Sequence, residues 1–184
     1  MKEIELTKGY VAIVDDDDYE WLSQYKWNAS ISSEKRWNSD PYVSAKTTIY
    51  KVWDDGFTWR RSEHMPRMIM NAKQGEVVDH INHVTLDNRK ENLRVCSAKE
   101  NGRNSNKQKS INGKPCTSIY KGATLSRCNK GKYGIYEYWR SQICVDGNMI
   151  YLGQFKTEED AALAYNDAAL KYHGDFARLN EIAS

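Results

Sequence analysis

The stretch from Val77 to Asn101, VVDHINHVTLDNRKENLRVCSAKEN, constrains the fold of this chain more than any other segment. It begins with an apolar pair that leads directly to Asp79 and His80, and a polar loop separates these from a second apolar run at residues 93–96. The residues that follow the second run are expected to form a helix.

The polar side chains of this segment suit metal binding and the activation of water. The carboxylate of Asp79 stands next to the imidazole of His80, and the amides of Asn92 and Asn101 follow. Carboxylate and amide oxygens bind hard cations, and an imidazole can remove a proton from water. Taken singly, these residues also have ordinary structural explanations: a loop cap, a buried hydrogen-bonded imidazole and a polar helix residue.

The charge of the chain is unevenly distributed, although its formal net charge is only +2. Residues 67–152 carry 15 basic and 7 acidic side chains, whereas residues 1–66 and 153–184 each have a net charge of −3. A basic centre between acidic ends indicates a polyanionic partner, and basic and aromatic residues interleave in 120–155, as in many nucleic-acid contact surfaces. A charge excess can also be a solvated face, so charge alone leaves both interpretations open.

Composition disfavours several other classes. No apolar run approaches the ~20 residues of a membrane-spanning helix. The N-terminus has no apolar core of the signal-peptide type, so a cytoplasmic protein without a membrane partner is expected. The cysteines form no C-x-x-C pair, which argues against a zinc ribbon or zinc finger. They are expected to be isolated thiols: Cys96, Cys116, Cys128 and Cys144.

Residues 1–64 are expected to form a small β-rich module. Alternating apolar residues in 1–14 predict two short strands joined at Lys8-Gly9. The acidic run 15–18 attracts cations, but consecutive side chains do not converge on one point. Acidic residues at a helix start favour the helix dipole, so we expect a helix there. The tryptophans of this region are expected to lie in a core rather than to stack on bases: Trp27, Trp37, Trp53 and Trp59.

The second half of the chain is predicted to be a linker followed by a small α+β domain. Residues 105–118 belong to a basic stretch that is too poor in apolar residues to build a core, so we interpret them as a linker. Apolar-rich segments in 119–155 predict a three-stranded antiparallel meander, with Asp146-Gly147 at its second turn. Thr157 is placed to cap an acidic helix start, and Gly174 is placed to end that helix.

On Asp79-His80, Asn92 and Asn101 the chain resembles the HNH endonuclease family, and specifically the phage-type homing endonucleases with a ββα-metal fold. The resemblance includes the spacing of twelve residues from His80 to Asn92, the nine residues from there to Asn101, and the run DNRKENLRV. It covers Arg67 to about residue 104. A nuclease core over 65–104 is therefore expected, beginning with a short helix at Pro66.

That resemblance implies a site-specific endonuclease that hydrolyses phosphodiester bonds in double-stranded DNA. Asp79 and Asn101 would hold one divalent cation, Mg²⁺ or else Mn²⁺, and zinc is not expected. His80 would be the general base, and Asn92 would brace the loop and orient His80. Candidates for phosphate contacts are Arg67, Arg89, Arg94, Arg103, Lys107 and Lys109. The first three could equally form surface ion pairs.

Residues 120–180 resemble the ethylene-response-factor (APETALA) DNA-binding domain. The resemblance rests on Tyr120-Lys121-Gly122, Trp139-Arg140, Leu152-Gly153 and the alanine-rich helix that precedes Gly174. It implies that the sheet lies in the major groove of DNA. The expected contacts are Lys121, Thr124, Arg127, Lys132, Arg140, Gln142 and Tyr151, with Trp139 placed between backbone and core.

Taken together, these features predict an α+β chain with a β-rich N-terminal module (1–64), a ββα-metal nuclease core (65–104), a basic linker (105–118) and a DNA-binding domain (119–184). Such a protein would act on duplex DNA as a monomer without a small-molecule cofactor. Two alternatives stay open. One is a DNA-binding regulator with a decayed nuclease motif, supported by Pro66 and His83. The other is a protein-interaction role for residues 1–66.

Overall fold

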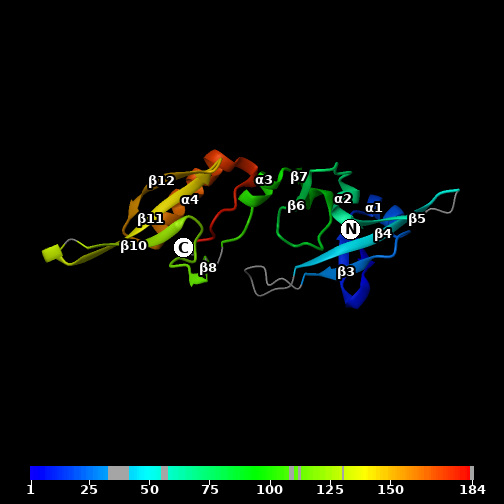
Figure 1. Ribbon diagram of the computed structural model, residues 1–184, viewed down its shortest axis with the longest axis horizontal. Coiled ribbons are helices and arrows are strands. Elements are labelled where there is room, and N and C mark those ends of the chain that lie inside the picture. The colour runs from blue at the N-terminus through cyan, green and yellow to red at the C-terminus, as the bar shows by residue number, and fades with distance from the viewer. Residues whose placement is uncertain (33–41, 55–57, 108–109, 112, 130, 183–184) are drawn as a thin grey trace. The chain divides into compact units, whose positions relative to one another are not determined.

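The computed structural model describes residues 1–32, 42–54, 58–107, 110–111, 113–129 and 131–182. The chain forms two compact units, Met1–Asn101 and Gly102–Ser184 (Figure 1). Each unit combines small antiparallel sheets with a few short helices, so the chain mixes α and β structure as predicted. No helix in the described ranges is long and apolar enough to cross a membrane.

The first unit contains three small antiparallel sheets, ordered β1-β2, β3-β4-β5 and β6-β7. Its elements are β1 (Lys2–Glu5), η1 (Thr7–Gly9), β2 (Val11–Val14), α1 (Asp16–Leu22), β3 (Asn28–Ile31), β4 (Val43–Val52), β5 (Thr58–His64), α2 (Met65–Ile69), β6 (Val77–His80), η2 (Lys90–Asn92), β7 (Leu93–Cys96) and α3 (Ala98–Arg103), whose last residues belong to the second unit. The predicted strand pair at the N-terminus and the acidic helix start are both confirmed.

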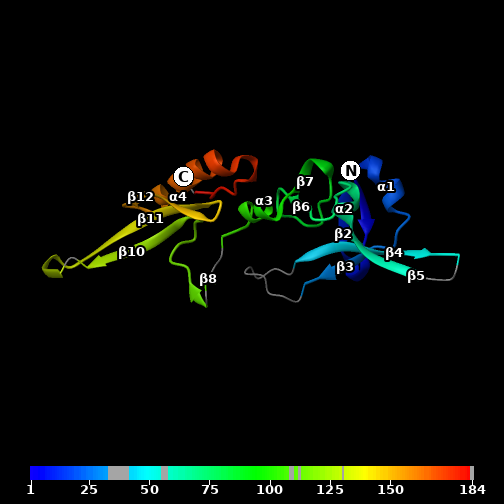
Figure 2. The same ribbon diagram turned by 45° about the horizontal axis from the view of Figure 1, so that its top comes forward.

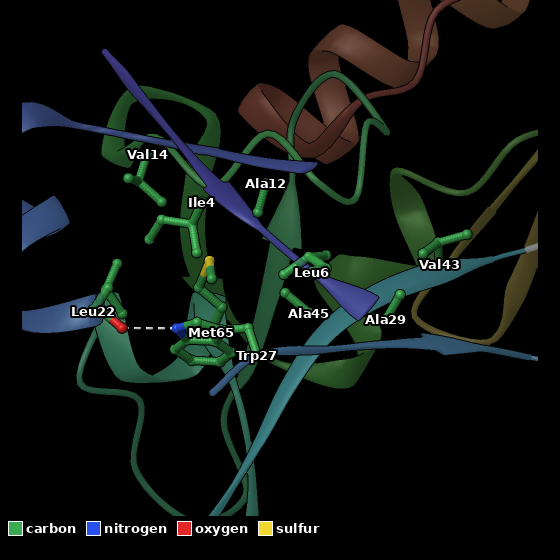
Figure 3. Packing of buried hydrophobic residues seen from close by; sticks show 10 residues of the cluster. All are labelled: Ile4, Leu6, Ala12, Val14, Leu22, Trp27, Ala29, Val43, Ala45 and Met65. Atoms are coloured by element: carbon green, nitrogen blue, oxygen red, sulfur yellow. Dashed lines mark hydrogen bonds between the residues drawn. The ribbon is translucent and has the colours of Figure 1, made fainter. Parts of the chain in front are cut away.

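One hydrophobic core joins the N-terminal strands to the segment that follows residue 64. Val14 of β2, Leu22 of α1 and Met65 of α2 are completely buried in it (Figure 3). The buried indole of Trp27 donates a hydrogen bond from Nε1 to the carbonyl oxygen of Leu22 at 2.8 Å, drawn as the dashed line in Figure 3. Residues 1–64 therefore share their core with the residues that follow them.

The prediction that the tryptophans lie in a core is confirmed for Trp27 and wrong for two others. Trp53 and Trp59 are 49% and 42% exposed, and Trp37 lies outside the described residues. The reason is topological: β3 pairs with β4 only over residues 43–46, whereas the β4–β5 pairing continues to Val52. Among the residues that the structure describes, no third strand pairs with the outer part of that hairpin.

Strands β6 and β7 pair in antiparallel register, and α3 follows them, giving the order ββα. The loop between the two strands is held by β2. The backbone N–H of Ile13 donates to the carbonyl oxygen of Leu86, and the N–H of Asn88 donates to the carbonyl oxygen of Ile13, both at 2.8 Å. The N-terminal strands thus fix the loop that follows His80.

The second unit is a three-stranded sheet, ordered β10-β11-β12, with one helix packed on it. Its elements are β8 (Ser110–Ile111), β9 (Lys114–Pro115), β10 (Ala123–Asn129), η3 (Gly131–Tyr133), β11 (Ile135–Val145), β12 (Asn148–Phe155), α4 (Glu158–His173) and η4 (Gly174–Phe176). Figure 2 shows α4 running along one face of the sheet. The predicted meander and helix are confirmed, and the Thr157 hydroxyl caps α4 by accepting from the N–H of Asp160 at 3.1 Å.

The predicted linker is partly structured. Strands β8 and β9 form a short hairpin within it. The ammonium of Lys121 donates to the carbonyl oxygens of Arg103 and Ser105 at 2.8 and 2.7 Å. Carbonyl groups at the end of a helix lack partners inside the helix, and a lysine can satisfy them. The chain after α3 is thus attached to Lys121, shortly before β10, the first strand of the C-terminal sheet.

Candidate functional site

The pairing of β6 with β7 places the expected metal ligand and the expected base on different faces. Asp79 lies opposite Arg94, and His80 lies opposite Leu93. Because successive strand residues point to opposite faces, Asp79 shares a face with Arg94 and not with His80. Asp79 and His80 are only 7% and 8% exposed, so each requires a polar partner inside the protein.

The partner of Asp79 is Arg94. Its Nε and Nη2 atoms donate to Asp79 Oδ2 at 3.0 and 2.7 Å. Only 15% of the Arg94 side chain and 9% of the Asp79 side chain are exposed, so the guanidinium compensates for a carboxylate taken out of water. The sequence left open whether Arg94 contacts phosphate or forms an ion pair, and the structure shows an ion pair.

The partner of His80 is Asn88, which the sequence analysis did not single out. His80 Nε2 lies 3.2 Å from Asn88 Oδ1, and Asn88 is completely buried. Burial lowers the pKa of His80 below its usual value of 6.5, and the hydrogen bond to Asn88 and the charge of Asp79 oppose that shift. The imidazole is therefore neutral at pH 7. If Nε2 donates to Asn88, Nδ1 is the basic nitrogen.

Asn92 braces the loop between β6 and β7, as predicted, through both ends of its side-chain amide. Its Oδ1 accepts from the backbone N–H of Asn82 at 2.9 Å, and its Nδ2 donates to the carbonyl oxygen of Asp87 at 2.8 Å. The side chain that contacts the His80 ring is Asn88. Asn92 acts on the loop that carries Asn88.

The expected second metal ligand, Asn101, lies on α3 near the end of β7. Its backbone N–H donates to the carbonyl oxygen of Ser97 at 3.0 Å and also bonds to the thiol of Cys96. Burial raises the pKa of that thiol, and the negative charge of Asp79 raises it further. Cys96 thus lies close to both expected ligands, and at neutral pH it is a thiol rather than a thiolate ligand.

The residues around Cys96 fit a hard divalent cation by the chemistry of their donors. They offer the Asp79 carboxylate and the Asn101 amide, and oxygen donors suit Mg²⁺ or Mn²⁺ rather than Zn²⁺. Within the residues that the structure describes, no three His, Cys, Asp or Glu side chains converge on a metal position. A cation bound to the Asp79 carboxylate would share it with Arg94.

The other two arginines expected at the site are also engaged within the protein. Arg67 donates to the carbonyl oxygens of Glu76, Ala72 and Lys73, and so closes the loop after α2. The guanidinium of Arg89 donates to both carboxylate oxygens of Asp87, at 2.8 and 2.7 Å, and this interaction lowers the pKa of Asp87. Arg67 and Arg89 therefore shape the loop, and their role as phosphate contacts stays a prediction.

In the second unit, four expected contact residues share the sheet face that points away from α4. Thr124 pairs with Arg140 across β10 and β11, and Gln142 pairs with Tyr151 across β11 and β12. The buried residues beneath α4, Ser141 and Ile143, alternate with these along β11. On the same face, the rings of Tyr136 and Tyr138 stack with centroids 5.9 Å apart.

Arg127 does not belong to that face. It lies three positions after Thr124 on the same strand and points to the opposite side, where its Nε donates to Glu137 at 2.6 Å.

The remaining residues that were expected to contact DNA do not gather on one face, and several already have partners within the protein. Trp139 is half-buried opposite Phe155, Arg103 pairs with Asp146, Lys121 holds backbone carbonyls, Lys107 is half-buried, Lys132 is exposed in η3, and Lys109 lies outside the described residues.

Comparisons with known proteins find two separate similarities. A family model described as "HNH endonuclease" matches residues 72–103, which include Asp79, His80, Asn92 and Asn101. The chain is 39% identical over 75 residues to an AP2-like ethylene-responsive transcription factor of Arabidopsis thaliana. That alignment covers 36% of this chain and only 17% of the plant protein. No solved structure matches.

Proposed function

We propose that this protein is a metal-dependent, site-specific DNA endonuclease of the homing type, acting on duplex DNA. The observation that carries the proposal is the arrangement at the end of β6. A buried, neutral His80 is held by Asn88 beside Asp79, within the segment that matches the HNH endonuclease model. A buried imidazole with a lowered pKa is a suitable general base at neutral pH.

In this mechanism, His80 accepts a proton from a water molecule as the water oxygen attacks the scissile phosphorus. The new O–P bond forms as the bond from phosphorus to the 3′-oxygen breaks, and the departing 3′-oxygen takes a proton from solvent water, which leaves a 5′-phosphate and a 3′-hydroxyl. Asn88 keeps the imidazole in position, and Asn92 keeps the loop that carries Asn88 in position. General-base help of this kind contributes roughly 10²–10⁴-fold to the rate.

Asp79 and Asn101 would hold the cation, and Mg²⁺ or Mn²⁺ bound there would neutralise charge on the phosphoryl and departing oxygens. The four residues on the outer face of the C-terminal sheet (Thr124, Arg140, Gln142 and Tyr151) would select the DNA sequence. The major groove is wide enough to admit β-strands, and polar side chains there can contact base edges.

The test is cleavage of duplex DNA from the genomic neighbourhood of the gene, labelled on both strands, in the presence of Mg²⁺. Wild-type protein should cut at a defined position, and His80→Ala should cut at least about a hundredfold more slowly. His64→Ala removes a histidine of the same unit that lies outside β6 and β7, and it should retain activity. Equal cutting by wild type and His80→Ala would refute the mechanism. The two labels also show whether one or both strands are cut.

A further inference from the structure

A cavity of about 330 Å³ opens on the second unit, at a place where three segments of the chain meet. Its walls are formed by residues 106–107, 119–121 and 178–181. The four sheet residues that are proposed to select DNA do not line it. Ligand pockets in proteins usually enclose roughly 300–1,000 Å³, so this cavity has room for a small molecule.

Hydrogen bonds hold the walls of the cavity in place. The side-chain amide of Asn180 accepts from the backbone N–H of Lys121 at 2.6 Å and donates to its carbonyl oxygen at 3.0 Å. The backbone of Asn180 forms two further hydrogen bonds with the side chain of Asn166 on α4, at 2.8 and 3.0 Å. The ammonium of Lys121 attaches the third segment by donating to the carbonyl oxygen of Ser105 at 2.7 Å. The fold itself therefore shapes the cavity.

Cationic side chains dominate this cavity. Lys107, Lys121 and Arg178 line it together with one acidic residue, Glu181. Burial lowers the pKa of Lys121, and the positive charge of Arg178 lowers it further, so these two cations repel each other. Among the residues that the structure describes, neither Lys107 nor Arg178 forms an ion pair with a carboxylate. An anion that enters the cavity would thus be attracted by all three cations and would relieve their repulsion.

Apolar side chains lie beside these cations. Ile119 is 77% exposed and Leu179 is 38% exposed, although both are large aliphatic residues. The half-buried side chain of Tyr120 also lines the cavity. In ligand sites a few polar groups orient the ligand, and apolar walls bury the rest of it. The lining therefore suits an anion that carries an apolar or aromatic body.

We propose that this cavity binds a free mononucleotide, with its phosphate at Arg178 and Lys107 and its base against Ile119 and Leu179. The three cationic and one acidic side chains give the lining a net charge of +2, and a phosphate monoester carries about −1.5 to −2 at pH 7. A guanidinium can bind two phosphate oxygens at once. The cavity lies at the small end of the usual range, which favours a mononucleotide over a dinucleotide. The site is separate from the nuclease residues, which belong to the first unit.

The site is tested by isothermal titration calorimetry of the whole 184-residue chain, with AMP, adenosine and inorganic phosphate as separate titrants at low ionic strength. Arg178→Gln and Lys107→Gln each remove one cation from the cavity. Their matched controls are Arg127→Gln and Lys171→Gln, which remove the same residue types from β10 and α4, away from the cavity. Ile119→Ser removes apolar surface and leaves the charges unchanged. Melting temperatures of all variants are measured to confirm folding.

AMP should bind, and adenosine and phosphate should each bind at least about tenfold more weakly, because each lacks one part of the ligand. Arg178→Gln and Lys107→Gln should each weaken AMP binding about tenfold, and both controls should bind AMP as wild type does. Ile119→Ser should weaken the binding of AMP and leave that of phosphate unchanged.

Three results would overturn the proposal: no binding of AMP, equal AMP affinities of the cavity variants and their controls, or equal affinities of wild type for AMP and phosphate. The last would show that the cavity takes an anion only. Displacement of bound AMP by a duplex of scrambled sequence would also overturn it, because the cavity would then hold a phosphate of the DNA backbone instead of a free nucleotide.

Discussion

Arg94 holds the carboxylate of Asp79 through two hydrogen bonds to the same oxygen, Oδ2. The two residues face each other across β6 and β7, and both side chains are largely buried. A metal ion bound to Asp79, as proposed, would compete with the guanidinium of Arg94 for the same carboxylate. The affinity for metal would then depend on Arg94.

Arg94→Met removes the guanidinium but keeps a side chain of similar length. The free energy of unfolding of the first unit should fall by about 1–3 kcal/mol, because a largely buried carboxylate loses its cation. Mn²⁺ should bind this variant more tightly than wild type in the absence of DNA, as measured by electron paramagnetic resonance titration. Arg89→Met is the control, because Arg89 pairs with Asp87 instead. Equal Mn²⁺ affinities for wild type and Arg94→Met would show that the two cations do not compete.

Asn88→Ala removes the side chain that holds His80. Single-turnover cleavage at saturating enzyme should slow by roughly 10- to 100-fold, because a small displacement of a base from the attacking water costs that much. DNA affinity should stay unchanged. Asn88→Asp keeps an oxygen near His80 Nε2 and should recover part of the rate. A purely structural role of Asn88 would instead predict that Asn88→Ala and Asn88→Asp lose activity in proportion to their loss of stability.

Two arginines on the C-terminal sheet allow a matched comparison of variants in a DNA-binding test. Arg140 lies on the face that points away from α4, whereas Arg127 lies on the other face and is paired with Glu137. Arg140→Gln should weaken binding to the target duplex by about 1–3 kcal/mol if it contacts a base, and Arg127→Gln should change it little. Electrophoretic mobility shifts with target and scrambled duplexes measure both. Similar losses in the two variants would argue that the sheet contributes only general positive charge.

Local patterns predicted most of the elements because each was specified by residues near in sequence. The N-terminal strand pair follows from alternation in 1–14, and α4 follows from the cap at Thr157 and the glycine at 174. The face of Arg127 was also predictable, since an interval of three along a strand changes sides. This alternation contradicts the expectation that Arg127 and Thr124 contact DNA from one face of the sheet, and the structure confirms the alternation.

Long-range packing could not be predicted in the same way. The contact of Asn88 with His80 depends on β2, since the backbone of Ile13 positions the loop from more than seventy residues away in sequence. Trp59 is of a residue type that usually lies in a core. It is exposed because β3 pairs with β4 only up to Lys46, short of the part of the hairpin that carries Trp59. The sequence indicated Asp79 and His80 as candidate site residues. That Arg94 and Asn88 are their hydrogen-bond partners became clear only from the fold.

Gly122→Ala should severely destabilise the second unit. Gly122 has a φ of +83°, and an added Cβ would lie 2.0 Å from the buried ring of Tyr165. We expect a loss of about 3 kcal/mol or more, because backbone strain and overpacking against α4 add together. Gly147→Ala shares the positive φ at +84° but meets nothing within 4 Å, so it should cost only about 1 kcal/mol. Urea unfolding monitored by the ¹⁹F signal of labelled Trp139 reports on this unit, and equal losses in the two variants would contradict the contact with Tyr165.

Lys121 should make the stability of the second unit increase with pH. Burial, aided by the charge of Arg178, lowers the pKa of Lys121 to about 8 from an ordinary value of 10.5. Between these two values the unfolded chain binds more protons than the folded chain, so the free energy of unfolding rises as the pH rises. Since part of the side chain contacts solvent, we expect a gain on the order of 1 kcal/mol from pH 7 to pH 9.5. Lys121→Met removes this titration and should flatten the dependence in the same ¹⁹F experiment. A slope that persists unchanged in Lys121→Met would mean that another group is responsible.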